Sequence, residues 1–133
     1  MSPGRVARDD STAAFFDGTA GGQFLLRRCD PDGHLSRPQA RQCSTCGTTN
    51  LLWSPASGGA RLVSWAVVPA RRSAEQEPPG PPTVVAIAEL DEGLWWWSQI
   101  VDADPDVLAE GQRLRIGFEA ADGGEAVPVF VLA

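Results

Sequence analysis

The stretch TVVAIAELDEGLWWWSQIV, residues 83–101, decides the fold class of this 133-residue chain. Its first part, residues 83–89, is rich in β-branched side chains, which favour a pleated strand. Asp91-Glu-Gly93 follows as a tight turn, because glycine readily adopts the positive φ that hairpin turns require. Residues 94–101 then form the partner strand. The stretch therefore predicts an antiparallel hairpin.

Further strands flank this hairpin on both sides. A Gly-rich entry at residues 57–60 leads into the strand before it, and residues 104–111, with Asp at the start and Gly at the end, predict one or two helical turns after it. The resulting order of three strands, a short helix and two strands is that of the OB-fold, a five-stranded Greek-key barrel. We expect this barrel over residues 57–133. Its remaining strands are predicted at 61–68, 113–119 and 126–132.

The first half of the chain predicts two smaller pieces, so the fold class is mainly β with little helix. Residues 1–22 predict a tail and a short helix over 12–17, with Gly18 as the first helix stop and Gly21-Gly22 as the second. Residues 23–56 predict a zinc-ribbon-like finger of short strands and two tight turns. A unit of this size buries little apolar surface, so it needs a metal, a disulfide or a partner to be stable.

Cys43 and Cys46 supply the stronger metal motif. They form a Cys-x-x-Cys pair followed by Gly47, which lets the turn fold so that both thiolates face one ion. The count of three cysteines is odd, which favours a metal over disulfides in a reducing compartment.

The first turn, Cys29-Asp-Pro-Asp-Gly33, has Asp32 where the second cysteine of such a pair would stand. Three outcomes stay open. Asp32 could complete a site of three cysteines and one aspartate, or His34 could complete a site of three cysteines and one histidine. Alternatively the finger holds no metal and is kept by packing alone. For Cys29 by itself, a buried apolar thiol is an ordinary alternative.

Composition limits the function. The net charge is −6 and all 11 basic residues are Arg, which argues against a general nucleic-acid binder. Hydrophobic residues make up 43% and charged residues 21% of the chain, enough for a packed core. No window has the roughly 18 apolar residues of a membrane span, and the start lacks the apolar segment of a signal peptide. We expect a cytoplasmic protein without a membrane partner.

Aromatic residues and one arginine pair are the candidate contact residues. Trp95 and Trp97 face one side of their strand and Trp96 the other, so one set fills the barrel and the other needs a cover. Phe15 and Phe16 fit either a partner interface or packing on the barrel. Arg71-Arg72, in the Pro-rich loop 69–82, suits the phosphates of an acyl-CoA, although a solvated charge pair is the ordinary alternative.

Several segments together resemble the DUF35 family. The resemblance runs from about residue 12 to the end of the chain, and Asp32 and the single Pro38 are its departures from the family pattern. The matching segments are Phe15-Phe16, 24–29, Cys43–Gly47, 57–64, 84–93, 110–115 and 127–130.

The resemblance implies a zinc-ribbon finger, an OB-fold barrel and no catalytic residues. It implies a subunit that docks on a thiolase-superfamily, lipid-transfer-protein-like enzyme acting on acyl-CoA, such as a steroid-CoA side-chain aldolase. A MaoC-like enoyl-CoA hydratase is a further implied partner. The chain has no Tyr or Lys, and its one His lies in a polar turn, which also disfavours independent catalysis. A single-stranded nucleic-acid-binding OB module and a purely structural scaffold remain the alternatives.

Overall fold

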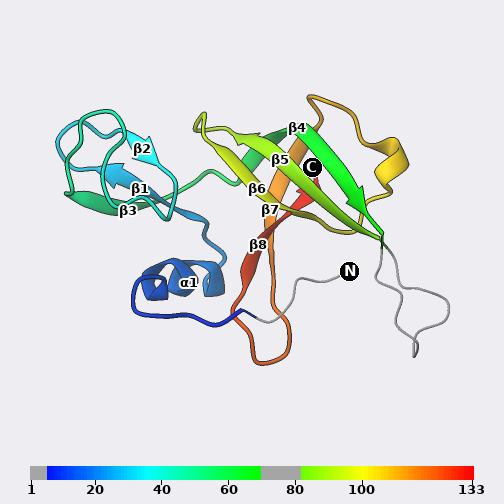
Figure 1. Cartoon of the computed structure of the whole chain (residues 1–133), viewed down its shortest axis with the longest axis horizontal. Coiled ribbons are helices and arrows are strands. Elements are labelled where there is room, and N and C mark those ends of the chain that lie inside the picture. The colour runs from blue at the N-terminus through cyan, green and yellow to red at the C-terminus, as the bar shows by residue number, and fades with distance from the viewer. Residues whose placement is uncertain (1–5, 70–81) are drawn as a thin grey trace.

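The structure is a computed structural model that describes residues 6–69 and 82–133. It is mainly β, with a three-stranded finger, a closed five-stranded barrel and one short α-helix beside them, as the sequence predicts (Figure 1). The elements are α1 (Ala13–Ala20), β1 (Leu25–Cys29), β2 (Leu35–Ser36), β3 (Leu51–Pro55), β4 (Gly59–Val68), β5 (Thr83–Leu90), β6 (Trp95–Ile100), the 3-10 helix η1 (Pro105–Val107), β7 (Arg113–Glu119) and β8 (Val127–Leu132).

The barrel closes in the order β4-β5-β6-β8-β7, with β7 returning to pair with β4. The predicted hairpin is confirmed, because β5 and β6 pair antiparallel and the Leu90 N–H donates to the Leu94 carbonyl at 2.7 Å. Gly93 has φ 88°, the left-handed conformation that the turn requires. The parallel contact of β6 with β8, at Ile100 and Phe130, gives the Greek-key crossing.

A β-bulge divides β4 into two halves, and the alternation of inward and outward side chains shifts by one residue between them. Leu62 pairs with Ala88, but the next partner, Ile87, pairs with Ser64, which leaves Val63 as the extra residue. Side chains alternate between the two faces of a strand, so the extra residue exchanges inward and outward positions. Leu62 before the bulge and Trp65 after it therefore both lie on the barrel side, and Trp65 packs against the core.

One apolar core joins the barrel to the base of the finger. Phe130, Leu62 and Leu114 from the barrel are at most 1% exposed, and Phe24 and Leu26, from the start of the finger, are buried in the same cluster. The Phe24 ring lies edge-on to Trp96 with centroids 5.0 Å apart. The finger, whose strands are ordered β2-β1-β3, is therefore rooted in the barrel core.

The helix α1 is longer than predicted, and the prediction that Gly18 ends it is wrong. The helix runs on to Ala20 and ends at Gly21, followed by Gly22 with φ 79°. A Cβ atom on residue 18 would lie 2.6 Å from Leu25 Cδ1. Glycine is therefore present at this position to permit close packing of the helix on β1, not to break the helix.

The predicted helical turns over 104–111 reduce to η1, a single three-residue 3-10 turn. The Asp104 side chain caps this turn by accepting the Asp106 N–H at 2.9 Å, as capping side chains do at helix starts. The helices of the described segments, 6–69 and 82–133, include none with the length and apolar character of a membrane span.

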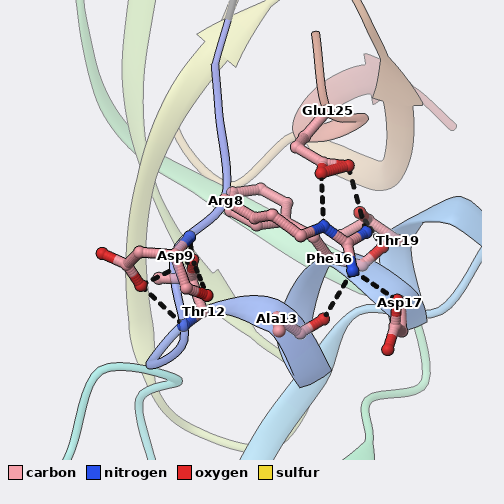
Figure 2. A network of polar contacts seen from close by, with 8 residues as sticks. All are labelled: Arg8, Asp9, Thr12, Ala13, Phe16, Asp17, Thr19 and Glu125. Carbon is pink, nitrogen blue, oxygen red and sulfur yellow. Dashed lines mark hydrogen bonds and ion pairs between the residues drawn. The ribbon is translucent and has the colours of Figure 1, made fainter.

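Arg8 ties the start of the described chain to both α1 and the barrel (Figure 2). Its guanidinium donates to Glu125, in the loop between β7 and β8, at 2.6 and 3.1 Å, and to Asp17 on α1 at 2.6 Å. The hydrogen bond that Glu125 accepts from Arg8 lowers the pKa of Glu125, and the hydrogen bonds that Arg8 donates to Glu125 and Asp17 raise the pKa of Arg8, because each favours the charged form. Asp9 precedes α1 and accepts the N–H groups of Ser11 and Thr12.

Candidate metal centre and docking face

Two turns of the finger bring four metal-ligand side chains together. Cys29, His34, Cys43 and Cys46 each offer a sulfur or ring-nitrogen atom, and these atoms all lie within 4.8 Å of one another. Three thiolates and one imidazole form a normal donor set for structural zinc. The donor types and their convergence therefore fit a single zinc ion.

The first turn, from Cys29 to His34, is closed by its own backbone. The Cys29 N–H donates to the His34 carbonyl at 2.9 Å, and the Gly33 N–H donates back to the Cys29 carbonyl at 2.8 Å. Gly33 has φ 74°, so a side chain there would be strained. The His34 N–H also donates to the Cys29 sulfur at 3.2 Å, which directs that sulfur into the turn.

The second turn, from Cys43 to Thr48, repeats this pattern. The Cys43 N–H donates to the Thr48 carbonyl at 2.8 Å, the Gly47 N–H donates to the Cys43 carbonyl at 2.9 Å, and Gly47 has φ 75°. The N–H groups of Thr45 and Cys46 both donate to the Cys43 sulfur at 3.4 Å. The finger is thus a pair of matching turns that face each other, as in a zinc ribbon.

The two turns differ in which position carries the second ligand. Cys46 is the fourth residue of its turn, where the first turn has Asp32, but Asp32 is exposed and is not one of the four grouped residues. His34, the sixth residue, places Nδ1 3.5 Å from the Cys29 sulfur and 3.8 Å from the Cys43 sulfur. Neighbouring ligands on a tetrahedral zinc ion stand about 3.5–3.8 Å apart. The geometry therefore favours His34 over Asp32.

The cysteine sulfurs have different electrostatic environments. The Cys46 N–H lowers the pKa of Cys43 to about 6, and the Thr45 N–H and His34 act in the same direction, because each stabilises the thiolate. The Thr48 N–H lowers the pKa of Cys46, but partial desolvation of this exposed thiol and the nearby Cys43 and Cys29 sulfurs outweigh it, so that pKa is raised. Cys43 is therefore more readily a thiolate at neutral pH than Cys46.

A second feature is an apolar face on the outside of β4, β5 and β6, which we call the docking face. It consists of Trp95, Trp97, Val85, Ile87 and Ala66, the outward positions of the three strands. Trp95, Trp97 and Val85 are 46%, 51% and 42% exposed. A shallow, mostly apolar hollow of about 390 Å³ lies beside Trp97. Exposed aromatic patches of this kind usually mark interaction sites.

Polar side chains hold the two tryptophans of the docking face. The Trp95 indole N–H donates to Glu89, which forms a 2.8 Å ion pair with Arg61. The Arg37 guanidinium, just after β2 of the finger, lies over the Trp97 ring at 5.1 Å from its centroid, within the range of a cation–π contact. The finger therefore contributes to the surface around Trp97.

The other predicted contact residues lie elsewhere. Phe16 is buried, Phe15 packs edge-on to Phe16 and Phe24, and Trp96 packs against the shared core. Arg71 and Arg72, predicted to bind the phosphates of an acyl-CoA, lie outside the described residues.

Sequence reasoning missed Arg27 and Trp53. They are cross-strand partners in β1 and β3, and the Arg27 guanidinium lies over the Trp53 ring at 4.2 Å from its centroid. The pairing depends on the register across a long, irregular connection. No local motif could have revealed it.

Comparisons with known proteins agree on the family. A family described as ChsH2, C-terminal OB-fold domain, matches residues 53–119, just over half of the chain. A DUF35 domain-containing scaffold protein of Pyrococcus furiosus is 27% identical over 94 residues, which is 67% of this chain and 63% of that protein. A probable enoyl-CoA hydratase alpha subunit of Thermomonospora curvata is 27% identical over 130 residues, which is 95% of this chain and 39% of that protein. The chain thus spans less than two thirds of the length of either relative.

Solved structures extend the likeness to the whole chain. A chain of the Ltp2-ChsH2(DUF35) aldolase superposes with a TM-score of 0.80 and 26% identity, and the match covers 96% of this chain and 98% of that one. A DUF35-family protein of unknown function from Sulfolobus solfataricus superposes with a TM-score of 0.61 and 11% identity, covering 93% and 86% of the two chains, and shares the fold.

Proposed function

The chain belongs to the DUF35 family of OB-fold proteins, and from this premise we propose that it is a non-catalytic accessory subunit of a thiolase-superfamily enzyme. One observation carries the proposal. The likeness to a chain of the Ltp2-ChsH2(DUF35) aldolase runs over nearly the full length of both chains, finger and barrel together. The Pyrococcus furiosus relative is itself described as a scaffold protein.

The proposed complex acts on acyl-CoA thioesters, with a steroid-CoA side-chain aldolase as the specific form. In this form the partner breaks the carbon–carbon bond, and this chain stabilises and shapes the partner's site. Arg71 and Arg72 remain our candidates for contact with the CoA phosphates. The likeness to a hydratase alpha subunit supports an enoyl-CoA hydratase of the MaoC-like class as a second partner.

The docking face is our proposed contact with the thiolase-superfamily partner. Large aromatic side chains at the centre of an interface account for a disproportionate share of binding energy. Trp97 is half exposed, lies beside an apolar hollow and is held in place by Arg37, so it is preorganised for such a role. Trp95 extends the same surface toward Glu89.

Zinc has a structural role in this proposal. Cys29, His34, Cys43 and Cys46 would hold the ion, and bound zinc supplies cross-links between the two turns of the finger. Arg37 lies three residues after His34, so the closed finger positions Arg37 over Trp97. We therefore propose that metal binding and partner binding are coupled through this arginine.

Co-expression with a thiolase-superfamily aldolase from the same organism tests the proposal. We expect the two proteins to co-elute in size-exclusion chromatography, and the carbon–carbon bond cleavage of an acyl-CoA substrate by the partner to require this chain. If the two elute separately and the activity is the same without this chain, the accessory role is wrong.

Two substitutions locate the interface. Trp97→Ser should weaken the complex by at least about tenfold, because a half-exposed aromatic anchor is lost. Val107→Ser, which changes a 59% exposed apolar residue on η1, should leave the affinity unchanged. Tight, salt-sensitive binding of single-stranded DNA by the free chain would instead support a nucleic-acid-binding module.

A further inference from the structure

A cleft lies where α1, the finger and the barrel meet, separate from both the metal centre and the docking face. Its volume is about 550 Å³. Small-molecule sites in proteins typically measure a few hundred cubic ångströms, so the cleft has the size of such a site. Four aromatic side chains line the cleft. The residues that matter for its chemistry are Phe15, Phe16, Arg27, Arg41, Trp53 and Trp96.

The charge of the cleft is opposite to that of the chain. The net charge of the protein is −6, yet the residues that line the cleft include Arg27 and Arg41 and, within the described part of the chain, no carboxylate. Arg41 is exposed at the cleft. A concave site lined by one sign of charge concentrates ligands of the opposite sign, so the cleft favours an anion.

Two buried N–H donors at the cleft lack acceptors. The Nε–H of Arg27 and the indole Nε1–H of Trp96 are both buried, and neither has a hydrogen-bond partner among the described residues. Buried polar groups in folded proteins nearly always have partners, because a buried, unpaired donor is unfavourable. Two such donors on residues that line one cleft point to an acceptor supplied from outside the chain.

Both donors are held in place by other contacts. The Arg27 Nη2 group donates to the Leu51 carbonyl at 3.3 Å while the guanidinium stacks on Trp53, so two sides of this arginine are fixed. Trp96 is fixed by its edge-on contact with Phe24. Both donor atoms are themselves covered, so a ligand in the cleft would reach them after a shift of neighbouring side chains, while the donors keep their positions.

We propose that this cleft binds a small organic anion with a flat apolar body, whose anionic oxygens accept the Arg27 Nε–H and the Trp96 Nε1–H. The apolar body would lie against the ring walls formed by Phe15, Phe16 and Trp53. The site does not depend on the proposed partner, because Trp96 faces the core side of β6 while Trp95 and Trp97 face the opposite side.

The test is a titration of the full-length chain, labelled with 15N, with 2-naphthoate and with its neutral amide. Indole N–H signals are well separated from backbone amides, and the Trp96→Phe variant assigns the Trp96 signal. We expect saturable binding of 2-naphthoate and a downfield shift of the Trp96 indole proton as it gains an acceptor. The amide should bind about tenfold more weakly or worse, because hydrogen bonds to a charged acceptor are the stronger ones.

Three variants separate the donors from general effects. Trp96→Phe keeps an aromatic ring beside Phe24 and removes the N–H together with the second ring of the indole, and should weaken 2-naphthoate by about tenfold. Arg27→Met keeps the stem and removes the charge, and should weaken it by about 30-fold. Arg28→Met, the neighbouring position on the opposite face of β1, should leave the affinity unchanged. The backbone amide spectrum shows whether each variant is folded.

Several results would overturn the proposal. Equal affinity for 2-naphthoate and its amide would show that the cleft binds apolar molecules without recognising an anion. Binding without a shift of the Trp96 signal would place the ligand elsewhere, and equal weakening by Arg28→Met would show a nonspecific effect of charge. An absence of 2-naphthoate binding up to millimolar concentration would also reject the site. If Arg27→Met does not fold, Trp96→Phe alone decides the outcome.

Discussion

The finger and the barrel are stabilised by different means. The barrel encloses a continuous cluster of aliphatic and aromatic side chains, with Phe130, Leu62 and Leu114 fully buried at its centre. The buried cluster at the far end of the finger consists only of Cys29, Cys43 and Leu51 among the described residues. Burial of apolar surface stabilises folds in proportion to its area, so the barrel has a large driving force and the finger a small one.

This difference indicates how the small finger can stay folded beside the larger barrel. The base of the finger shares the barrel core through Phe24 and Leu26, but its tip has only a small buried cluster beside the four grouped side chains that could hold a metal ion. We therefore expect perturbations of the tip and of the barrel to have separable effects, and each experiment below tests that separation.

Removal of the metal should have the largest effect. Purified chain should contain close to one zinc per molecule, and a strong chelator or His34→Ala should unfold the tip of the finger, because metal binding supplies most of its stability. Elemental analysis and amide exchange of residues 29–50 measure the two effects. The barrel amides should stay protected.

Asp32→Ala is the matched control and should retain zinc. If it loses zinc while His34→Ala keeps it, the ligand set contains the aspartate instead of the histidine. If the barrel unfolds together with the finger, the separation between the two regions is wrong.

Phe130→Ala should have the next largest effect, now on the barrel. Phe130 is fully buried. Loss of such a phenylalanine typically costs about 3–5 kcal/mol through lost burial and the cavity that remains. Urea unfolding followed by barrel signals measures this cost, and Phe130→Leu should cost much less. Zinc content in native buffer should stay unchanged. A Phe130→Ala chain that is folded but lacks zinc would show that the metal centre depends on the barrel core.

Gly18→Ala should have an intermediate effect at the junction of the two regions. The new Cβ would lie 2.6 Å from Leu25 Cδ1. Overpacking of this kind typically costs about 1–3 kcal/mol. Gly21→Ala is the control, because its nearest neighbour would lie 3.5 Å from the new Cβ. Thermal denaturation compares the two, and equal melting temperatures would mean that α1 shifts away from β1 at little cost.

The ion pair between Arg8 and Glu125 should have the smallest effect. The folded-state pKa of Glu125 is lowered. Its contribution to stability is therefore present above its unfolded pKa of about 4.3 and is lost as the pH falls through the folded pKa. The melting temperature of Glu125→Gln should lie slightly below that of the parent chain at pH 7, and the gap should close as the pH falls through the folded pKa of Glu125. A gap that stays constant with pH would show that this carboxylate does not contribute through its charge.

The strands of the barrel could largely be predicted from the sequence, because alternation of apolar and polar residues indicates both a strand and the face of it that points inward. The limits predicted for β7, residues 113–119, agree with the structure. The helical turns after β6 were overestimated, since Asp and Gly mark the ends of a turn without fixing its length. The prediction that Gly18 ends the helix failed because a glycine required for close packing cannot be told from a helix stop in the sequence.

The candidate sites could be predicted less completely than the barrel. The three cysteines were evident, but the choice between Asp32 and His34 depends on where each side chain points after the first turn folds. The anionic-ligand cleft was invisible, because Arg27 and Trp96 meet only through the register of β1 and the contact between finger and barrel. Long-range placement of this kind leaves no local pattern.

The bulge at Val63 has an evolutionary consequence for β4. Because Val63 has no partner of its own on β5, a relative that lacks this one codon would keep the neighbouring pairs, with Leu62 and Trp65 still inward and Ser64 outward. A deletion farther along the strand that was absorbed by loss of the bulge would exchange the faces of the residues in between, and Trp65 would turn toward solvent. Single-residue differences in the length of this strand should therefore cluster at the bulge, and an alignment that opens its gap elsewhere would misassign inward and outward residues.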